Sequence, residues 1–350
     1  GAAAGPAAPP AVPDAARQPV SRASSGEVVV FVDADVAPGA GWLEPLLAHL
    51  ADPAVGIVAP RVRSRPGRSL LERYERHRSP LDLGDREARV VPRGRVSYVP
   101  TATVVCRREL LEQLDGFAPG MRVGEDVDLV WRAVESGWTV RYEPATEVEH
   151  RPRADWGALA RQRATYGSAA APLDQRHPGS VAPVELNAWS LAAWLLAALG
   201  GRTGALAGAG VAIGSSLALA PKLRGRLDRP VATSLRLAGG GTLQAGAWLG
   251  RSVWRAWLPF AVVGSLRSRR VRRATLAAAV VPALLDRRAA GPEPGIDPVR
   301  WTLLHALDQA AYCAGVWRGA WRCRSARALL PRLSGIPGVT RDSGTGPARG

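Results

Sequence analysis

The stretch that decides the fold is Glu27-Val28-Val29-Val30-Phe31-Val32, which leads directly into Asp33-Ala34-Asp35. A short run of β-branched and aromatic residues is typical of a buried strand. Apolar residues then recur at helical spacing, namely Trp42, Leu43, Leu46, Leu47 and Leu50. Residues 55–59 form a second apolar run, which ends at Pro60. A strand–helix–strand unit of this length predicts an α/β fold with a parallel sheet covered on both faces.

The segments on either side of this unit are less regular. Residues 1–25 are rich in Ala and Pro and have no period, which is typical of a flexible linker. We expect an extended segment at 96–105 and helices at 107–114, 124–132 and 156–166. The chain starts with Gly1, and Met121 is its only methionine, so we expect a fragment whose true N-terminus is missing.

Composition and charge exclude several classes of protein. Hydrophobic residues make up 47% of the chain, which excludes a wholly disordered protein, and the three cysteines lack the spacing of a disulfide scaffold or a zinc module. Residues 1–150 carry 18 basic and 21 acidic side chains, whereas residues 151–350 carry 28 and 9. We therefore expect two regions, 1–180 and 181–350. No nucleic-acid role is expected, because the arginines lie among Trp and aliphatic residues and the acidic half would repel phosphate backbones.

The pair Asp33 and Asp35 carries the clearest chemical signal. In an open α/β sheet, ligands bind beyond the carboxyl ends of the strands. Two carboxylates one residue apart at such an end can hold a hard divalent cation, which in turn contacts phosphate oxygens. The alternative is a surface pair in a turn that caps the following helix.

A second group of acids, Gly124-Glu125-Asp126-Val127-Asp128, opens a predicted helix after a glycine-containing loop. Acids in the first turn stabilise a helix through its dipole, so capping alone can explain them. A general base, however, needs a positioned carboxylate that faces an acceptor hydroxyl. The position of this group after a strand-end Asp pair favours the second interpretation.

The third signal extends from His150 to the run Arg161-Gln162-Arg163-Ala164-Thr165-Tyr166-Gly167. His150 ends a strand–loop segment and could complete a metal shell through an imidazole nitrogen, although a lone His is more often structural. Arginines at helical spacing suit bidentate phosphate contacts, and the alternative is a solvated helix face.

The C-terminal region is apolar and basic. Residues 186–200 and 205–220 are each shorter than the ~20 residues that cross a bilayer, and a helix joining them would carry Arg202 near its middle. Residues 241–266 form another apolar stretch, followed by Arg267, Arg269, Arg270, Arg272 and Arg273. We expect a mostly helical, membrane-associated region with an interfacial anchor. The alternative is a pair of core helices in a soluble domain.

Three segments together resemble glycosyltransferase family 2 of the GT-A fold. They are VVVFVDADVAPGAGWLEPLL (28–47), DGFAPGMRVGEDVDLVWRAVESGWTVRYEP (115–144) and VEH (148–150). More narrowly, YVPTATVVCRREL (98–110), RATYGSAAAPLDQRHPG (163–179) and LDQAAYCAGVWRGAWRCRSARALLPRL (307–333) resemble the glycosyltransferases of the mycofactocin system. The resemblance covers residues 17–333, nearly all of the chain.

This resemblance implies roles for particular residues. Asp33 and Asp35 would hold Mg²⁺ or Mn²⁺ against the diphosphate of the donor, with His150 near the metal. Asp126 would be the general base that deprotonates the acceptor hydroxyl. The substrate-binding positions would be Glu125 on the acceptor side, Asp128, and the segment that takes the place of the family's Gln-x-x-Arg-Trp motif, which contributes Arg163, Tyr166 and Gly167.

The resemblance also implies an inverting, metal-dependent transfer of a hexose, glucose from UDP-glucose, to the peptide-derived redox cofactor mycofactocin or its precursor. The enzyme would act at the cytoplasmic side of the bacterial membrane. The GT-A domain would lack its first βαβ unit, and Gln18 and Val20 stand where the family has Asn and Gly. Two alternatives remain: a membrane polysaccharide or lipid-linked glycosyltransferase, and a decayed, non-catalytic transferase fragment that serves as a membrane-bound interaction module.

Overall fold

The chain forms two compact units. The computed structural model describes residues 25–153, 155–225, 227–291 and 295–334, so the linker expected up to residue 24, with Gln18 and Val20, lies outside the described residues. Unit 1 consists of Gly1–Val181 and Asp286–Ala328, and unit 2 of Ala182–Leu285 and Leu329–Gly350. The sequence-based division at 180/181 stays a prediction about domains. The two compact units are not two continuous halves of the chain, because the C-terminal segment Asp286–Ala328 belongs to unit 1.

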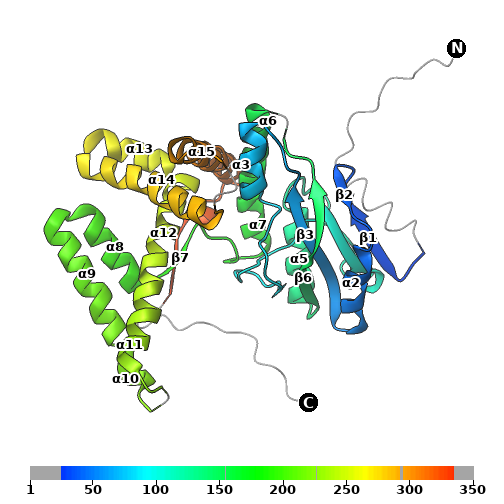
Figure 1. Ribbon diagram of the computed structural model, residues 1–350, viewed down its shortest axis with the longest axis horizontal. Coiled ribbons are helices and arrows are strands. Elements are labelled where there is room, and N and C mark those ends of the chain that lie inside the picture. Colours follow the sequence, from blue (N-terminus) through cyan, green and yellow to red (C-terminus); the bar gives the residue numbers. More distant parts are fainter. Residues whose placement is uncertain (1–24, 154, 226, 292–294, 335–350) are drawn as a thin grey trace. The chain divides into compact units, whose positions relative to one another are not determined.

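A six-stranded sheet forms the centre of unit 1 (Figure 1). Its strands are β1 (Val28–Val32), β2 (Val36–Pro38), β3 (Val55–Ser64), β4 (Ala88–Arg89), β5 (Thr103–Arg107) and β6 (Thr139–His150). They lie in the order β1-β5-β3-β6-β2, and β4 pairs with β6. β3 and β6 are parallel, whereas the other described pairs are antiparallel.

This mixed sheet confirms the α/β class but corrects the prediction of a parallel sheet. β1 and β3 run in the same direction, but β5 lies between them and is antiparallel to both. Because β5 follows both strands in the chain, the short spacing between β1 and β3 in the sequence does not indicate that another strand lies between them.

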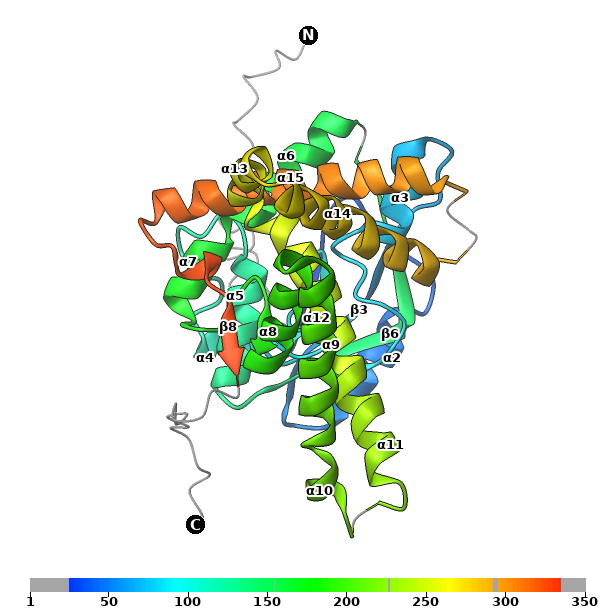
Figure 2. The ribbon, with the colours of Figure 1, turned by 90° about the vertical axis from the view of Figure 1, so that its left-hand side faces the viewer.

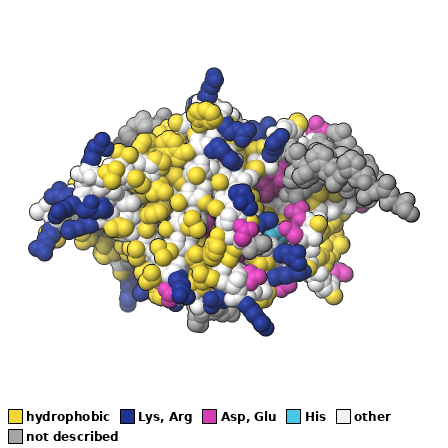
Figure 3. Space-filling view, turned by 90° about the horizontal axis from the view of Figure 1, so that it is seen from above, with side chains coloured by type: hydrophobic (Ala, Val, Ile, Leu, Met, Phe, Trp, Pro, Cys, Tyr) yellow, Lys and Arg dark blue, Asp and Glu magenta, His cyan; other side chains and the backbone are white. Residues whose placement is uncertain are grey.

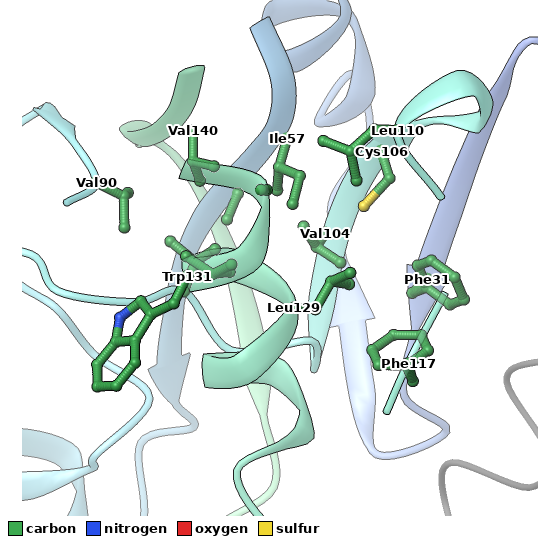
Figure 4. Close-up of a cluster of buried hydrophobic side chains, with 14 of the residues drawn as sticks. Phe31, Ile57, Val90, Val104, Cys106, Leu110, Phe117, Leu129, Trp131 and Val140 are labelled. Atoms are coloured by element: carbon green, nitrogen blue, oxygen red, sulfur yellow. The ribbon is translucent and has the colours of Figure 1, made fainter. Parts of the chain in front are cut away.

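One face of the sheet is covered by α5 (Glu125–Glu135). Leu129 and Trp131 of this helix belong to the same buried cluster as Phe31 of β1 and Ile57 of β3 (Figure 4). Phe31 also meets the ring of Phe117 edge-on, with 5.5 Å between centroids. This cluster is the main core of unit 1.

The opposite face is covered only in part. Leu46, from α2 (Leu43–Ala48), is fully buried with Val58 and Val105. On the same face of β1, however, Val30 and Val32 remain 36% and 43% exposed. The prediction that both faces of this strand are covered is therefore wrong for the described residues. The strand also lies at one end of the strand order, and the absence of a first βαβ unit stays a prediction.

Helices surround the sheet of unit 1. Besides α2 and α5 they are α3 (Leu70–Arg78), α4 (Arg108–Gln113), α6 (Trp156–Ser168), α7 (Ala170–Arg176) and α15 (Pro298–Arg322), with the short 3₁₀ turn η1 (His49–Ala51). Side-chain caps start three of them. Ser69 and Glu72 form a capping box at α3, and Asp155 and Asp297 accept backbone N–H bonds at α6 and α15. The helices expected at 107–114, 124–132 and 156–166 are thus confirmed.

Helices α6 and α15 cross at very short range because glycines lie at the crossing. A Cβ on Gly167 would lie 2.2 Å from the carbonyl oxygen of Tyr312, and a Cβ on Gly315 would lie 1.9 Å from that of Ala164. A Cβ on Gly319 would likewise meet the oxygen of Ser168 at 2.5 Å. Only glycine allows the two backbones to approach in this way. The distal segment that resembles the mycofactocin-system enzymes is therefore part of unit 1.

Unit 2 is built mainly from helices (Figure 2). Its elements are α8 (Ala188–Leu199), α9 (Gly201–Leu217), α10 (Ala220–Leu223), α11 (Pro230–Ser234), the π-helical turn η2 (Leu235–Gly239), α12 (Gly240–Arg255), α13 (Leu258–Arg267) and most of α14 (Arg269–Ala289). Strand β7 (Glu185–Asn187) pairs in parallel with β8 (Arg332–Ser334), and the 3₁₀ turn η3 (Arg327–Leu329) precedes β8.

The apolar segments of unit 2 break at glycine. Gly201, with a φ of 65°, separates α8 from α9, which places Arg202 at the start of a helix rather than in its middle. Among the described residues, one helical stretch, Gly201–Leu223, is long and apolar enough to cross a membrane. The most apolar part of this stretch is only 22% buried.

Candidate functional site

The site begins where β1 ends. Asp33 follows the last residue of β1, and its backbone N–H donates to the carbonyl of Ala102 at 2.9 Å. The N–H of Val36 then donates back to the carbonyl of Asp33 at 3.0 Å, which closes a tight turn. This turn holds the carboxylates of Asp33 and Asp35 at the carboxyl end of a central-sheet strand, as the sequence predicts.

His150, the last residue of β6, joins this turn. Val36 of β2 is its partner across the strand pair, and its Nε2 lies 3.1 Å from Oδ2 of Asp35. Burial lowers the pKa of His150 below its ordinary value, although the nearby charge of Asp35 acts in the opposite direction. His150 is therefore neutral at pH 7, the form in which an imidazole nitrogen binds a metal. The structure brings together Asp35 and His150, two of the three predicted ligands.

Asp126 lies in the first turn of α5, which starts after Gly124 in a left-handed conformation with a φ of 82°. Its Oδ1 accepts the backbone N–H of Val127 at 2.8 Å, and its side chain is half-buried. Burial raises the pKa of Tyr166, and the charge of Asp126 raises it further. The Tyr166 hydroxyl also accepts a hydrogen bond from Gln162 at 3.1 Å. Asp126 and Tyr166 are thus electrostatic neighbours.

Asp128, by contrast, lies inside the protein. Its carboxylate is fully buried and binds three cationic side chains: Nε of Arg132 at 2.7 Å, Nε2 of His177 at 3.0 Å, and Arg176. Burial alone would raise the pKa of Asp128, but these hydrogen bonds outweigh it and hold the pKa well below the usual range. Because three side chains already bind this carboxylate, the predicted substrate-binding role of Asp128 is set aside. Its contact with Arg176 instead links α5 to α7.

Arg163 is likewise buried and paired. Its Nε donates to Oδ1 of Asp308 at 2.6 Å, and a terminal nitrogen lies 3.4 Å from Oε1 of Glu75. Asp308 also accepts from the hydroxyl of Tyr74 at 3.0 Å. The prediction that Arg163 binds substrate through phosphate contacts is therefore set aside. The predicted substrate-binding role of Gly167 is set aside as well, because Gly167 lies at the α6–α15 crossing.

Sequence analysis missed Tyr74, Glu75 and Asp308. A signal was available for Asp308 alone: an acid among the mainly apolar residues 301–317 needs a buried cation, and Arg163 is one.

A second group of potential ligand atoms lies elsewhere in unit 1. In the described part of the chain, atoms of His49, Glu87 and Glu143 lie within 4.8 Å of one another. His49 and Glu143 are already hydrogen-bonded at 2.9 Å, and Glu87 forms an ion pair with Arg141. These contacts satisfy the three side chains without a metal.

Three comparisons place the chain among known proteins. A family model described as "Glycosyltransferase like family 2" matches residues 12–167. The pre-mycofactocin glycosyltransferase of Mycobacterium tuberculosis, in strains CDC 1551 and H37Rv alike, is 39% identical over 327 residues, which cover 92% of this chain and 69% of that protein. A mannosyltransferase from Pyrobaculum calidifontis, solved with GDP-Man and Mn²⁺, covers 86% of this chain and 65% of its own, with 21% identity and a TM-score of 0.38.

The sequence likeness covers 92% of this chain and therefore extends over both units. The chain is thus a glycosyltransferase that belongs to glycosyltransferase family 2 and, within it, to the family of the pre-mycofactocin glycosyltransferases.

Proposed function

We propose that the protein transfers a hexose, glucose from UDP-glucose, to mycofactocin or its precursor, with inversion at the anomeric carbon. The observation that carries this proposal is the grouping of Asp35 with His150 at the strand ends, 3.1 Å apart. The 39% identity to the pre-mycofactocin glycosyltransferase supports the acceptor. The donor sugar follows from the family resemblance.

The residues at the strand ends fit a divalent cation. Asp33 and Asp35 offer carboxylate oxygens and His150 offers a neutral nitrogen, a mixed set that suits Mn²⁺ and, through its oxygens, Mg²⁺. Bound there, the ion would neutralise negative charge on the departing diphosphate. The protein's part is to hold the three side chains in place through the β1 turn and the β2–β6 pairing.

Asp126 is proposed as the general base. In the reaction, the acceptor hydroxyl oxygen forms a bond to the anomeric carbon while the bond from that carbon to the phosphate oxygen breaks. The electron pair of the broken bond leaves with the nucleoside diphosphate, and the hydroxyl proton passes to the Asp126 carboxylate. Glu125, the preceding residue in the first turn of α5, is proposed to contact the acceptor.

We also propose that unit 2 holds the enzyme at the cytoplasmic face of the membrane. Its helices expose large apolar side chains, including Leu206 at 75% and Leu266 at 80%. A core helix of a soluble protein would be mostly buried, whereas the apolar window within Gly201–Leu223 is 22% buried. Arginines close to apolar residues suit the anionic cytoplasmic leaflet.

The test of the reaction is Asp126→Asn in an assay with UDP-glucose, Mg²⁺ and pre-mycofactocin. Loss of a general base should lower kcat by about 100- to 10,000-fold, and mass spectrometry should show one added hexose per transfer by the wild-type protein. Asp85→Asn, which changes an exposed acid of the same unit, is the matched control and should leave the rate unchanged.

Different outcomes favour the alternatives. A wild-type rate in Asp126→Asn would show that another group removes the proton. Transfer to a lipid fraction of a cell extract, but not to pre-mycofactocin, would favour a lipid-linked acceptor. No binding of UDP with Mn²⁺ would favour a non-catalytic role.

A further inference from the structure

The loop between β6 and α6 carries an arginine to which sequence analysis assigns no role. After His150 the chain continues Arg151-Pro152-Arg153, and α6 begins at Trp156. The N–H of Arg151 donates to the carbonyl of Asp35 at 3.1 Å, and the N–H of Arg153 donates to Oε2 of the buried Glu75 at 2.6 Å. Backbone hydrogen bonds therefore hold Arg151 against the turn after β1 and Arg153, two residues further along, against Glu75.

The side chain of Arg153 is half-buried, and its Nε atom is buried without a hydrogen-bond partner among the described residues. Six arginines bury an Nε atom that makes no hydrogen bond, namely Arg63, Arg65, Arg73, Arg78, Arg141 and Arg153. Four of the other five form an ion pair with a carboxylate, and Arg73 donates to the carbonyl of Gly295. Among the described residues, Arg153 has neither an ion pair with a carboxylate nor a side-chain hydrogen bond to a carbonyl oxygen. A buried, unsatisfied charged donor is costly, so this one indicates an anionic ligand.

The same charge acts on both ends of the proposed site. Burial is the main effect on both pKa values: it lowers that of His150 and raises that of Tyr166. The positive charge of Arg153 is a smaller effect and lowers both. His150 contacts Asp35, and Tyr166 is influenced by Asp126. Arg153 is thus within electrostatic range of His150, which contacts Asp35, and of Tyr166, which the charge of Asp126 also influences.

We propose that Arg153 binds the diphosphate of the donor, with its guanidinium donating to the non-bridging phosphate oxygens. This inference rests on the proposed function and adds a residue to it. A planar guanidinium makes two parallel hydrogen bonds to a phosphate, which an ammonium group cannot. When the bond from the anomeric carbon to the phosphate oxygen breaks, the electron pair moves onto the diphosphate, and the adjacent positive charge stabilises it there.

The pairing of Arg163 explains why Arg153, and not Arg163, performs this role. Arg163 lies on α6, ten residues further along, and its charge is already matched by Asp308 and Glu75. Glu75 contacts both arginines. Its Oε1 accepts a hydrogen bond from the side chain of Arg163, and its Oε2 accepts one from the backbone N–H of Arg153. The carboxylate therefore neutralises the first arginine and positions the backbone of the second.

The test is UDP binding in the presence of Mn²⁺, measured by calorimetry on the wild-type protein and three variants. Arg153→Gln should weaken binding by about 10- to 100-fold, the size of a lost hydrogen bond to a charged group. Arg153→Lys should also bind more weakly than wild type, because lysine keeps the charge but not the bidentate geometry. Arg151→Gln, in the same loop but exposed, is the matched control and should bind like wild type.

Two further measurements separate this role from a structural one. Neither Arg153 variant should unfold at a lower temperature than wild type, since Arg153→Gln removes a costly unsatisfied charge. Uridine, which has no phosphate, should bind equally to all. Wild-type affinity for UDP in Arg153→Gln would overturn the inference, and so would wild-type affinity in Arg153→Lys if the first variant does not fold. Asp126→Asn should still bind UDP, so a failed base assignment and a failed diphosphate assignment give different results. A wild-type protein that does not bind UDP with Mn²⁺ would overturn both.

Discussion

Units 1 and 2 bury different kinds of side chain. The twelve largest fully buried side chains, among them Trp301, Tyr74 and Phe117, all belong to unit 1. Buried positions on the helices of unit 2 are instead mainly small residues such as Ala193, Ala245 and Ala283, whereas its large apolar side chains are widely exposed. Figure 3 shows exposed hydrophobic side chains bordered by arginines over a broad area of one face.

The two units also differ in how arginine is used. In unit 1, arginines such as Arg132 and Arg163 are paired with buried carboxylates. The main segment of unit 2, residues 182–285, has 13 basic residues and only two acids, Glu185 and Asp228. A unit held together by specific ion pairs and close packing suits a reaction that needs fixed geometry. A unit with exposed apolar and basic side chains suits an anionic lipid surface.

The largest effect on stability is expected from Asp308→Ala in unit 1. The substitution leaves Arg163 charged and buried without its main partner, which should lower the free energy of unfolding by about 3–5 kcal/mol. Denaturant unfolding measures this. Asp297→Ala, which removes only the exposed N-cap of the same helix, should lower the free energy of unfolding much less. An equal loss of unfolding free energy in Asp308→Ala and Asp297→Ala would show that the buried ion pair stabilises unit 1 no more than an exposed helix cap does.

An intermediate effect is expected from His177→Gln, and it depends on pH. Burial alone would lower the pKa of His177, but its hydrogen bonds to Asp128 and Glu135 outweigh this and raise it. Folding therefore favours the charged imidazole. This stabilisation is fully present below the ordinary value of about 6.5 and is lost as the pH rises through the folded pKa.

Wild type should thus exceed His177→Gln in unfolding free energy at pH 5.5, and the difference should shrink at pH 8.5. Denaturant unfolding at the two pH values measures it. If wild type and His177→Gln differ equally in unfolding free energy at both pH values, protonation of His177 does not contribute to stability.

The smallest effect on stability is expected in unit 2. Phe260→Ser with Leu266→Ser changes side chains that are 65% and 80% exposed, and should alter unfolding by no more than about 0.5 kcal/mol each. Sedimentation with vesicles containing anionic lipid should nevertheless fall at least about tenfold, since each side chain gains about 1.5–3 kcal/mol when buried in an apolar phase. Val299→Ser, 69% exposed in unit 1, is the matched control and should bind vesicles like wild type. Unchanged binding in the double variant would remove the proposed membrane role of this surface.

Much of the proposed site could be read from local sequence. Asp33 and Asp35 follow an apolar strand, and Asp126 opens a helix after Gly124. Their placement depends on neighbours within a few residues, because a strand end and a helix start are set by local patterns. The contact of His150 with Asp35 is consistent with the predicted metal set, whose function stays a prediction.

The sequence by itself determined the α/β class, the apolar and basic character of the second region and the family. Only the tertiary structure decided that β5 separates β1 from β3 and that Asp128 and Arg163 are buried and paired. It also decided that the buried Nε of Arg153 has no partner within the described parts of the chain. The reason is distance along the chain. Arg163 and Asp308 are 145 residues apart, so no local period encodes their contact. Whether an arginine is available to a ligand depends on which acid the fold brings to it, and that is a property of packing rather than of spacing.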